Sequence, residues 1–211
     1  MNELSATALL ELVAARHGHF RLESGHHARL WLDLDSLFAE PGRVTTFVTG
    51  LADRIRAYDV SAVCGPLVGG AFLAQPVAQA LDVEFWFTER VMPEDADGLY
   101  RARYVLPPSL AKRVPDKRVA IVDDVMSAGS SLRGTSAELR SHGAKPVVAG
   151  ALLVLGSVGE SYFAEQRIAL EAVARSDYEL WLPTECPLCA VGTPLEDVVS
   201  SGEQTVPVEH G

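Results

Sequence analysis

The sequence predicts an α/β protein with a doubly wound, mostly parallel sheet, and two observations support this. From about residue 60 onward, apolar strand-like segments alternate with segments of helical periodicity, which is the order of βαβ units. The segment KRVAIVDDV, residues 117–125, contains a nearly continuous apolar run, as expected for a strand buried on both faces of a sheet. A length of 211 residues suits one domain, or a domain with a small appendage.

The N-terminal region predicts one amphipathic helix, two short strands and a second helix. Residues 3–16 place leucines and a valine on one helical face. The segments HFRLESG, residues 19–25, and ARLWLDLD, residues 28–35, have the character of strands, and the second alternates leucines with other side chains. After Pro41 a helical pattern runs to about Tyr58.

The rest of the chain predicts the elements of the sheet. Helices are expected near residues 71–81 and over residues 130–143, where a glycine caps the end. The stretch VMPEDADG, residues 91–98, is polar and loop-like, and the polar C-terminal residues are expected to fray. Strands are expected in VSAVCGPLVGG (60–70), VEFWFTE (83–89), LYRARYVL (99–106), KRVAIVDDV (117–125), KPVVAGALLVLG (145–156) and YELWL (178–182).

The composition excludes several classes of protein. The chain is 48% hydrophobic and 22% charged without a run of 18 apolar residues, so no transmembrane helix is expected. A formal charge of -10, with no cluster of lysine and arginine to offset it, argues against nucleic-acid binding. Three cysteines and an N-terminus whose acidic residues precede its basic ones predict a cytoplasmic protein without a disulfide framework.

The stretch VAIVDDVMSAGSSL, residues 119–132, carries the clearest chemistry. Two aspartates, Asp123 and Asp124, end a buried strand, and ligands of open parallel sheets bind at that end. The small residues that follow open a helix, where backbone N–H groups and the helix dipole favour an anion. Carboxylates accept hydrogen bonds from ribose hydroxyls, so the pattern predicts a ribose 5-phosphate site. The alternative is that the two aspartates only cap an ordinary turn. Neither G-x-x-x-x-G-K-[ST] nor G-x-G-x-x-G occurs in the chain, so these two motifs do not indicate a different nucleotide site.

This stretch resembles the phosphoribosyl pyrophosphate (PRPP) signature of type I phosphoribosyltransferases, and the wider chain resembles the orotate phosphoribosyltransferases. FRLESGHHARLWLDLD resembles the strands of their N-terminal hood, and CGPLVGGAFLA resembles their pyrophosphate loop. TER followed by LYRARYVLP resembles their mobile catalytic loop, and WLPTECPLCAVGTPLE resembles a Cys-Pro-x-Cys segment of one bacterial branch. The resemblance implies the type I phosphoribosyltransferase fold with a small hood. It divides the chain into hood elements (1–40), a PRPP-binding core (41–175) and a C-terminal segment (176–211).

The resemblance also implies a reaction and the residues that perform it. A base nitrogen displaces pyrophosphate from the anomeric carbon of PRPP, with Mg2+ held mainly by PRPP itself and by no identifiable protein ligand. A homodimer is implied, whose loop at about residues 90–100, acidic at Glu94, Asp95 and Asp97, closes over the neighbouring site. The implied catalytic residues are Asp123, Asp124, Arg101 and Arg103. The implied PRPP-binding residues are Gly65, Pro66, Gly69, Gly70, Arg90, Asp123, Asp124, Ser127, Ala128, Gly129, Ser130 and Ser131. The implied base-binding residues are Glu23, Ser24, Gly25, His26, Trp31 and Gly156.

Three features depart from the family pattern and leave the identity of the base undetermined. Glu23 replaces a basic residue before the Ser-Gly pair, and Gly156 stands where an arginine usually faces the orotate carboxylate. The catalytic loop offers arginine in place of lysine, a cation of different geometry. The nearest other cations for a carboxylate are His26, His27 and Arg29. A transferase for another base and a non-catalytic PRPP or nucleotide-binding regulator are therefore kept as alternatives to the orotate enzyme.

Cysteine, histidine and tryptophan leave further alternatives. Cys186 and Cys189 have metal-ligand spacing but supply only half a site, so a structural turn or a zinc ion shared between protomers is expected. The pair His26-His27 indicates either a solvated turn or contact with the base. Trp31, Trp86 and Trp181 suit the core, with Trp31 also a candidate for stacking on the base.

Overall fold

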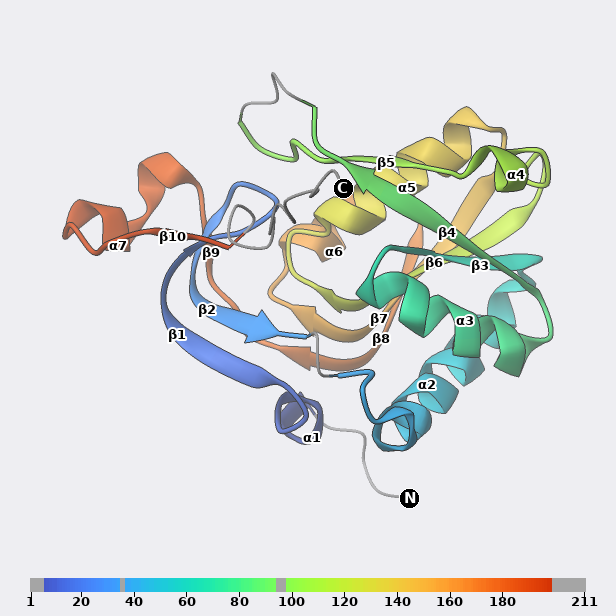
Figure 1. Cartoon of the computed structure of the whole chain (residues 1–211), viewed down its shortest axis with the longest axis horizontal. Coiled ribbons are helices and arrows are strands. Elements are labelled where there is room, and N and C mark those ends of the chain that lie inside the picture. The colour runs from blue at the N-terminus through green and yellow to red at the C-terminus, as the bar shows by residue number, and fades with distance from the viewer. Residues whose placement is uncertain (1–5, 35–36, 94–97, 199–211) are drawn as a thin grey trace, which may run out of the picture.

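A computed structural model describes residues 6–34, 37–93 and 98–198, and these form two sheets of different size (Figure 1). The larger sheet has six strands in the order β5-β4-β3-β6-β7-β8. Every neighbouring pair in it is parallel except β4 and β5, which confirms the predicted α/β class. Its strands are β3 (Ala62–Pro66), β4 (Glu84–Val91), β5 (Arg103–Val105), β6 (Arg118–Met126), β7 (Lys145–Leu155) and β8 (Ala169–Ser176).

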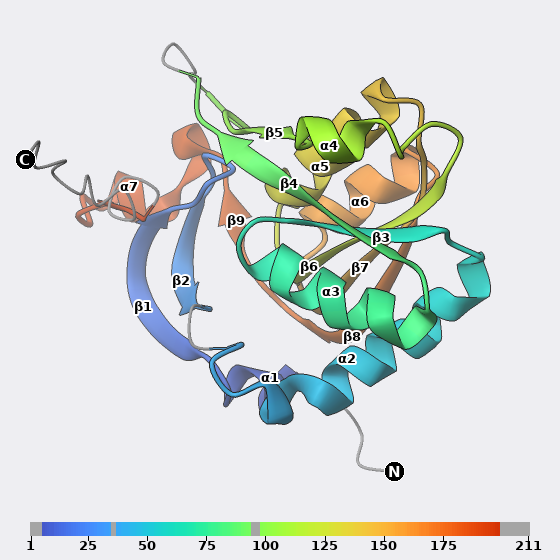
Figure 2. The same cartoon turned by 45° about the vertical axis from the view of Figure 1, so that its right-hand side comes forward.

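Helices cover both faces of the large sheet. Helices α2 (Pro41–Ile55) and α3 (Gly69–Leu81) lie on one face. Helices α4 (Pro108–Ala111), α5 (Ser130–Ser141) and α6 (Val158–Glu165) lie on the other (Figure 2). The strands between them are buried on both sides, which is why β6 and β7 carry near-continuous apolar runs.

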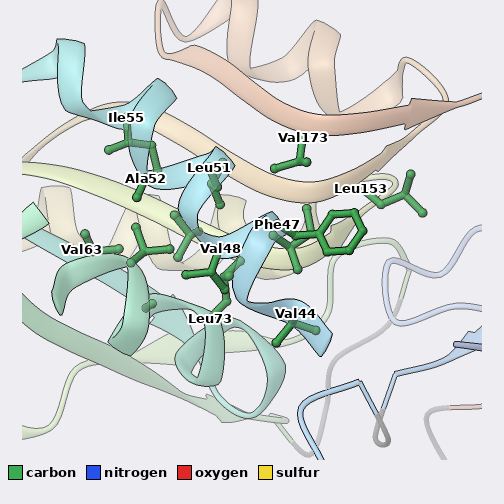
Figure 3. Close-up of a cluster of buried hydrophobic side chains, with 14 of the residues drawn as sticks. Val44, Phe47, Val48, Leu51, Ala52, Ile55, Val63, Leu73, Leu153 and Val173 are labelled. Carbon is green, nitrogen blue, oxygen red and sulfur yellow. The ribbon is translucent and has the colours of Figure 1, made fainter. Parts of the chain in front are cut away.

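The core beneath α2 shows how the helical pattern is used. Side chains at positions 44, 47, 48, 51, 52 and 55 form one buried stripe of this helix. Figure 3 shows this stripe facing Val63 of β3, Leu153 of β7 and Val173 of β8. Val63 and Val173 are 110 residues apart in the chain, so this one helix packs across the sheet from β3 to the edge strand β8.

The smaller sheet, here called the hood, joins the two ends of the described chain. Its order is β10-β1-β2-β9, with bounds Ala14–Arg21 for β1, His27–Asp33 for β2, Leu180–Trp181 for β9 and Glu196–Asp197 for β10. Strands β1 and β2 pair along most of their length, whereas β9 and β10 each contribute two residues. Figures 1 and 2 both show the hood beside the large sheet, with α7 (Pro187–Ala190) at its outer edge. The short helices α1 (Ala6–Leu10), η1 (Arg56–Tyr58) and η2 (Pro183–Glu185) complete the described chain.

Several predicted elements change length, and others were missed. The helix expected over residues 3–16 is described only as α1, because residues from Ala14 onward pair with β2. The strand expected over residues 99–106 shortens to β5, and the one over residues 178–182 shortens to β9. The sequence did not predict α6 or β8, although β8 forms the edge of the large sheet. Within the described ranges, no helix is long and apolar enough to cross a membrane.

Candidate active site

A cavity of about 430 Å³ lies between the hood and the carboxyl ends of the central strands. Its walls come from the turn after β1, from β2, from the loop between β3 and α3, and from the ends of β4, β6 and β7. This is the edge of a parallel sheet where ligands are expected. The lining residues are Leu22, Glu23, Ser24, Trp31, Leu32, Leu34, Pro66, Leu67, Val68, Gly69, Gly70, Arg90, Tyr104, Asp123, Val125, Ser127, Ser130, Ser131, Leu155, Tyr178 and Val198.

Asp123 and Asp124 stand at the end of β6, and both are more than 90% buried. The Ser131 hydroxyl donates to Asp123 Oδ2, and the backbone N–H of Asp124 donates to Asp123 Oδ1 at 3.1 Å. The backbone N–H of Val125 donates to Asp124 Oδ1 at 2.7 Å. Burial, followed by the negative charge of Asp124, raises the pKa of Asp123. Asp123 faces the cavity, whereas Asp124 lies against the start of α3.

The glycines at the start of α3 allow the backbone to lie on these carboxylates. A Cβ atom added at Gly69 would lie 2.1 Å from Asp124 Oδ2, and one at Gly70 would lie 2.8 Å from Asp123 Oδ1. Gly65 is equally confined, since its Cβ would lie 2.0 Å from the Gly70 carbonyl oxygen. The sequence CGPLVGG therefore folds as a tight loop that only glycine permits at these positions, with Pro66, Gly69 and Gly70 lining the cavity.

The turn after β6 supplies groups suited to an anion. Gly129 has a φ of 75° and precedes the first turn of α5, a helix of 12 residues. Three serines, Ser127, Ser130 and Ser131, line the cavity, whereas Ala128 and Gly129 are buried behind them. Hydroxyls and the N-terminus of a helix therefore meet at the end of the cavity where Asp123 lies.

Glu23, Arg90 and Tyr104 form a connected group on the cavity wall. Arg90 Nε lies 3.5 Å from Glu23 Oε2, and the Tyr104 hydroxyl donates to Glu23 Oε1 at 2.7 Å. Burial, followed by the charge of Glu23, raises the pKa of Tyr104. Among the described residues, Arg90 is the one cation in the lining, and it is already paired with a carboxylate. No local pattern pointed to Tyr104, which meets Glu23 across 81 positions of the chain.

The residues expected to bind the base divide into two sets. Glu23, Ser24 and Trp31 line the cavity, whereas Gly25, His26 and Gly156 do not. Gly156 has a φ of 66°, and a Cβ there would lie 2.6 Å from the Tyr178 carbonyl oxygen, so this position has no room for a side chain.

The turn that carries Gly25 and His26 is covered by the chain before β5. Gly25 has a φ of 83° and packs against Gly98 and Leu99. His26 is buried, with Nδ1 lying 3.1 Å from the Ser24 hydroxyl, so the interpretation of a solvated turn is wrong. Burial, followed by the charge of Arg133, lowers the pKa of His26.

The arginines expected to act in catalysis do not reach this cavity. Arg103 is exposed on β5, and the buried Arg101 Nε has no hydrogen-bond partner within the described part of the chain. The sequence did not single out Arg133 of α5, whose guanidinium lies 4.4 Å from the Tyr100 ring and 4.0 Å from the Tyr162 ring. The acidic loop residues Glu94, Asp95 and Asp97 lie outside the described residues.

One of the three tryptophans, Trp86, lies in the core as expected. Trp86 is 1% exposed and donates to Glu84 at 3.0 Å. Trp181 is partly buried on β9, where the guanidinium of Arg29 lies 5.9 Å from its ring. Trp31 differs, because it lines the cavity and packs against Phe20 with ring centroids 6.5 Å apart. Its ring is therefore available to a ligand.

Comparisons with known proteins identify the family. Residues 43–176 match the model of the phosphoribosyl transferase domain. The orotate phosphoribosyltransferase of Carboxydothermus hydrogenoformans is 35% identical over 188 residues, covering 88% of this chain and 91% of the relative. That of Thermotoga maritima is 31% identical over 189 residues, covering 90% and 94%.

Solved structures show the same fold at lower identity. The orotate phosphoribosyltransferase of Aeropyrum pernix superposes with a TM-score of 0.59 at 23% identity, covering 79% of this chain and 89% of the other. The adenine phosphoribosyltransferase of Trypanosoma brucei gives a TM-score of 0.60 at 13% identity, covering 93% and 90%. Fold, domain match and curated relatives coincide, and the chain belongs to the phosphoribosyltransferase family as an orotate-type enzyme, a pentosyltransferase.

Proposed function

We propose that the cavity binds PRPP and orotate, and that the enzyme transfers ribose 5-phosphate to the base. A base nitrogen forms a bond to the anomeric carbon while the bond to pyrophosphate breaks, and the nitrogen's proton is released. The observation that supports this best is the position of Asp123 beside three serines at the start of α5, all facing one cavity. Relatives 30–35% identical over most of the chain are named orotate phosphoribosyltransferases, which favours orotate over another base and turnover over a regulatory role.

Each wall of the cavity receives one part of PRPP in this proposal. The 5-phosphate accepts hydrogen bonds from the N-terminus of α5 and from the serines of the preceding turn. Asp123 accepts from a ribose hydroxyl, and Asp124 fixes the loop of Gly69 and Gly70 that faces the pyrophosphate. Positive charge grows on the ribose ring during displacement, and the nearby carboxylates stabilise it.

The residues present suit Mg2+, the ion implied for this reaction. Magnesium prefers oxygen ligands and is commonly bound by one or two carboxylates together with substrate phosphates. The lining offers Asp123 and Glu23 as carboxylates, and Asp124 lies directly behind Gly69. When bound, the ion neutralises charge on the departing pyrophosphate. The chain's own residues orient the sugar and exclude water from the anomeric carbon.

Base recognition falls to the hood wall, where Ser24, Trp31 and the Glu23–Arg90 pair lie. Orotate is an anion, and Arg90 is the cation of the described lining that can meet its carboxylate or the pyrophosphate. Arg29 is exposed and its guanidinium lies near Trp181, so it does not serve this wall. Glu23 partly neutralises Arg90 and so determines how strongly Arg90 attracts an anionic substrate.

We also propose a cytoplasmic homodimer. Val68, the residue before α3, and Phe72 in its first turn are 62% and 53% exposed. Phe72 also lines an apolar groove between α2 and α3, together with Phe38 and Pro76. Such a patch suits burial against a second copy. Arg101 and Arg103 do not line the cavity of their own chain, which supports their action on a neighbour's site. The free cysteines suit a reducing compartment.

The double substitution Asp123→Asn with Asp124→Asn tests the PRPP site. Loss of charge-assisted hydrogen bonds should weaken PRPP binding by about 10- to 150-fold. Titration calorimetry with PRPP and Mg2+ measures this, with Asp116→Asn, an exposed aspartate in a distant turn, as the control. Unchanged affinity in the double variant would show that the ribose site lies elsewhere.

The single substitution Asp123→Asn should stabilise the fold while it weakens the site. Asparagine can keep the contacts to Ser131 and the Asp124 N–H but removes a carboxyl group whose pKa is raised by burial and, second, by the charge of Asp124. Because the pKa of Asp123 is raised in the folded state, the contribution of this carboxyl group to stability falls as pH rises above about 4, the usual pKa of a carboxyl group in the unfolded chain. The variant should gain about 0.5 to 2 kcal/mol at pH 7 and nothing at pH 3, by chemical denaturation. If the variant is less stable than wild type at pH 7, the buried carboxylates of Asp123 and Asp124 do not destabilise the fold as argued.

Glu23→Gln tests the ion pair on the hood wall. Glutamine can still accept from Tyr104 but no longer neutralises Arg90, so KM for PRPP or orotate should fall by up to about 5-fold. Steady-state kinetics should show the opposite change in Arg90→Gln, which removes the cation. Equal losses in both variants would mean that the Glu23 carboxylate itself binds substrate.

Mixing two inactive variants tests the dimer. Asp123→Asn with Asp124→Asn is combined with Arg101→Ala plus Arg103→Ala, and random exchange should restore about one quarter of wild-type activity. Hybrid dimers then hold one site with intact aspartates and an intact neighbouring loop. A monomer in sedimentation velocity, or no recovery after exchange, argues against action across the dimer.

A further inference from the structure

Two cysteines and two histidines meet at the outer edge of the hood, away from the cavity. His19 lies on β1, His27 on β2, and Cys186 and Cys189 flank the first turn of α7. One nitrogen or sulfur atom from each of the four lies within 4.8 Å of all the others. Three of the residues are buried and Cys189 lies at the surface, which leaves a path for an ion. The two cysteines had seemed half a site because their partners lie about 160 to 170 positions away.

The spacing of these atoms matches the edges of a metal tetrahedron. His19 Nε2 lies 3.0 Å from His27 Nδ1, 3.4 Å from Cys186 Sγ and 3.7 Å from Cys189 Sγ. Cys189 Sγ lies 3.3 Å from His27 Nδ1. Zinc bonds of about 2.0 to 2.1 Å to nitrogen and about 2.3 Å to sulfur place tetrahedral ligands roughly 3.3 to 3.8 Å apart. The four atoms therefore need only small shifts to enclose an ion.

A hydrogen bond at one nitrogen of the His19 ring leaves the lone pair of the other nitrogen facing this cluster. His19 Nδ1 lies 2.8 Å from the carbonyl oxygen of Thr193, which can only accept. The proton of the neutral ring therefore sits on Nδ1, and Nε2 is left as an acceptor facing three other heteroatoms. A carbonyl behind a ligating histidine is the arrangement that fixes ring orientation in metal sites.

Hydrogen bonds among these four side chains match their donors and acceptors poorly. His19 Nε2 has one lone pair, yet one nitrogen and two sulfur atoms lie within 3.7 Å of it. The two sulfurs are free thiols in the structure and not a disulfide. A cation at the centre would use the lone pair of every member, with two protons leaving the thiols as it binds.

We propose that His19, His27, Cys186 and Cys189 form a structural Zn2+ site within one chain. The closed set of two nitrogens and two sulfurs suits a tetrahedral ion and leaves no position for substrate. The site joins β1 and β2 to the segment between β9 and β10, each of which pairs with the hood through only two residues. It lies next to His26, which contacts Ser24 on the cavity wall, so the ion fixes the turn that forms the base site.

Metal content provides the first test. The full-length enzyme, purified with zinc and dialysed, should hold about one Zn2+ per chain by elemental analysis. Replacement by Co2+ should give the visible absorption of a tetrahedral cobalt–thiolate site that saturates at one equivalent. Cys189→Ser and His19→Gln should each lower Co2+ affinity by more than about 100-fold, since losing even an outer hydrogen-bond partner costs about 10- to 100-fold.

Matched controls separate this site from chance binding. His17→Gln changes an exposed histidine on the same strand as His19, and Cys64→Ala changes the third cysteine, buried in β3; both should keep the metal. Should the ligand variants fail to fold, chelation of the wild-type enzyme should still release zinc and lower Tm. Absence of zinc from the wild type, zinc retained by both ligand variants, or a Cys186–Cys189 disulfide under anaerobic purification would overturn the proposal.

Discussion

The close approach of the α3 backbone to two buried carboxylates is the constraint on which the active site depends. Asp124 and Asp123 occupy the space that side chains at positions 69 and 70 would need. This packing fixes the glycine loop, the end of β6 and the serine turn relative to one another. The energetic cost is a buried carboxylate pair: burial first, and the charge of Asp124 second, raise the pKa of Asp123. Catalytic sites commonly retain such destabilising groups because the reaction needs them.

The two walls of the cavity are stabilised in different ways. The wall proposed for PRPP is part of a six-stranded sheet with an apolar core on each face. The wall proposed for the base belongs to the hood, where the outer strands are two residues long. Tyr178 donates to the carbonyl of Leu30, and the Ser24 carbonyl accepts from the N–H of Tyr100. The hood therefore depends on a few specific contacts where the core depends on buried area.

The same difference explains what the sequence could and could not predict. Local signals were sufficient for the centre of the large sheet, where a buried strand ending in Asp123 and a serine turn opening α5 are contiguous, but they missed α6 and the edge strand β8. They failed in the hood, where β1 replaces part of an expected helix through pairing with β2. Contacts across long separations were also out of reach, including Tyr104 with Glu23 and the histidines with the cysteines. Gly156 was expected to mark a missing arginine, yet its positive φ and the Tyr178 carbonyl account for the glycine.

In the proposed assignment, base recognition rests on the hood, whose outer strands are short. The turn that contains Ser24 connects β1 to β2. His27, the first residue of β2, follows this turn and belongs to the four-residue cluster. Any cross-link at that cluster limits how far the turn can move, without touching the carboxylates or the serines of the PRPP wall. In this proposal, substitutions in the hood alter the response to the base more than the response to PRPP. The hood turn meets the core at Glu23, which pairs with Arg90 of β4 and accepts from the Tyr104 hydroxyl of β5, so this carboxylate connects the two halves electrostatically.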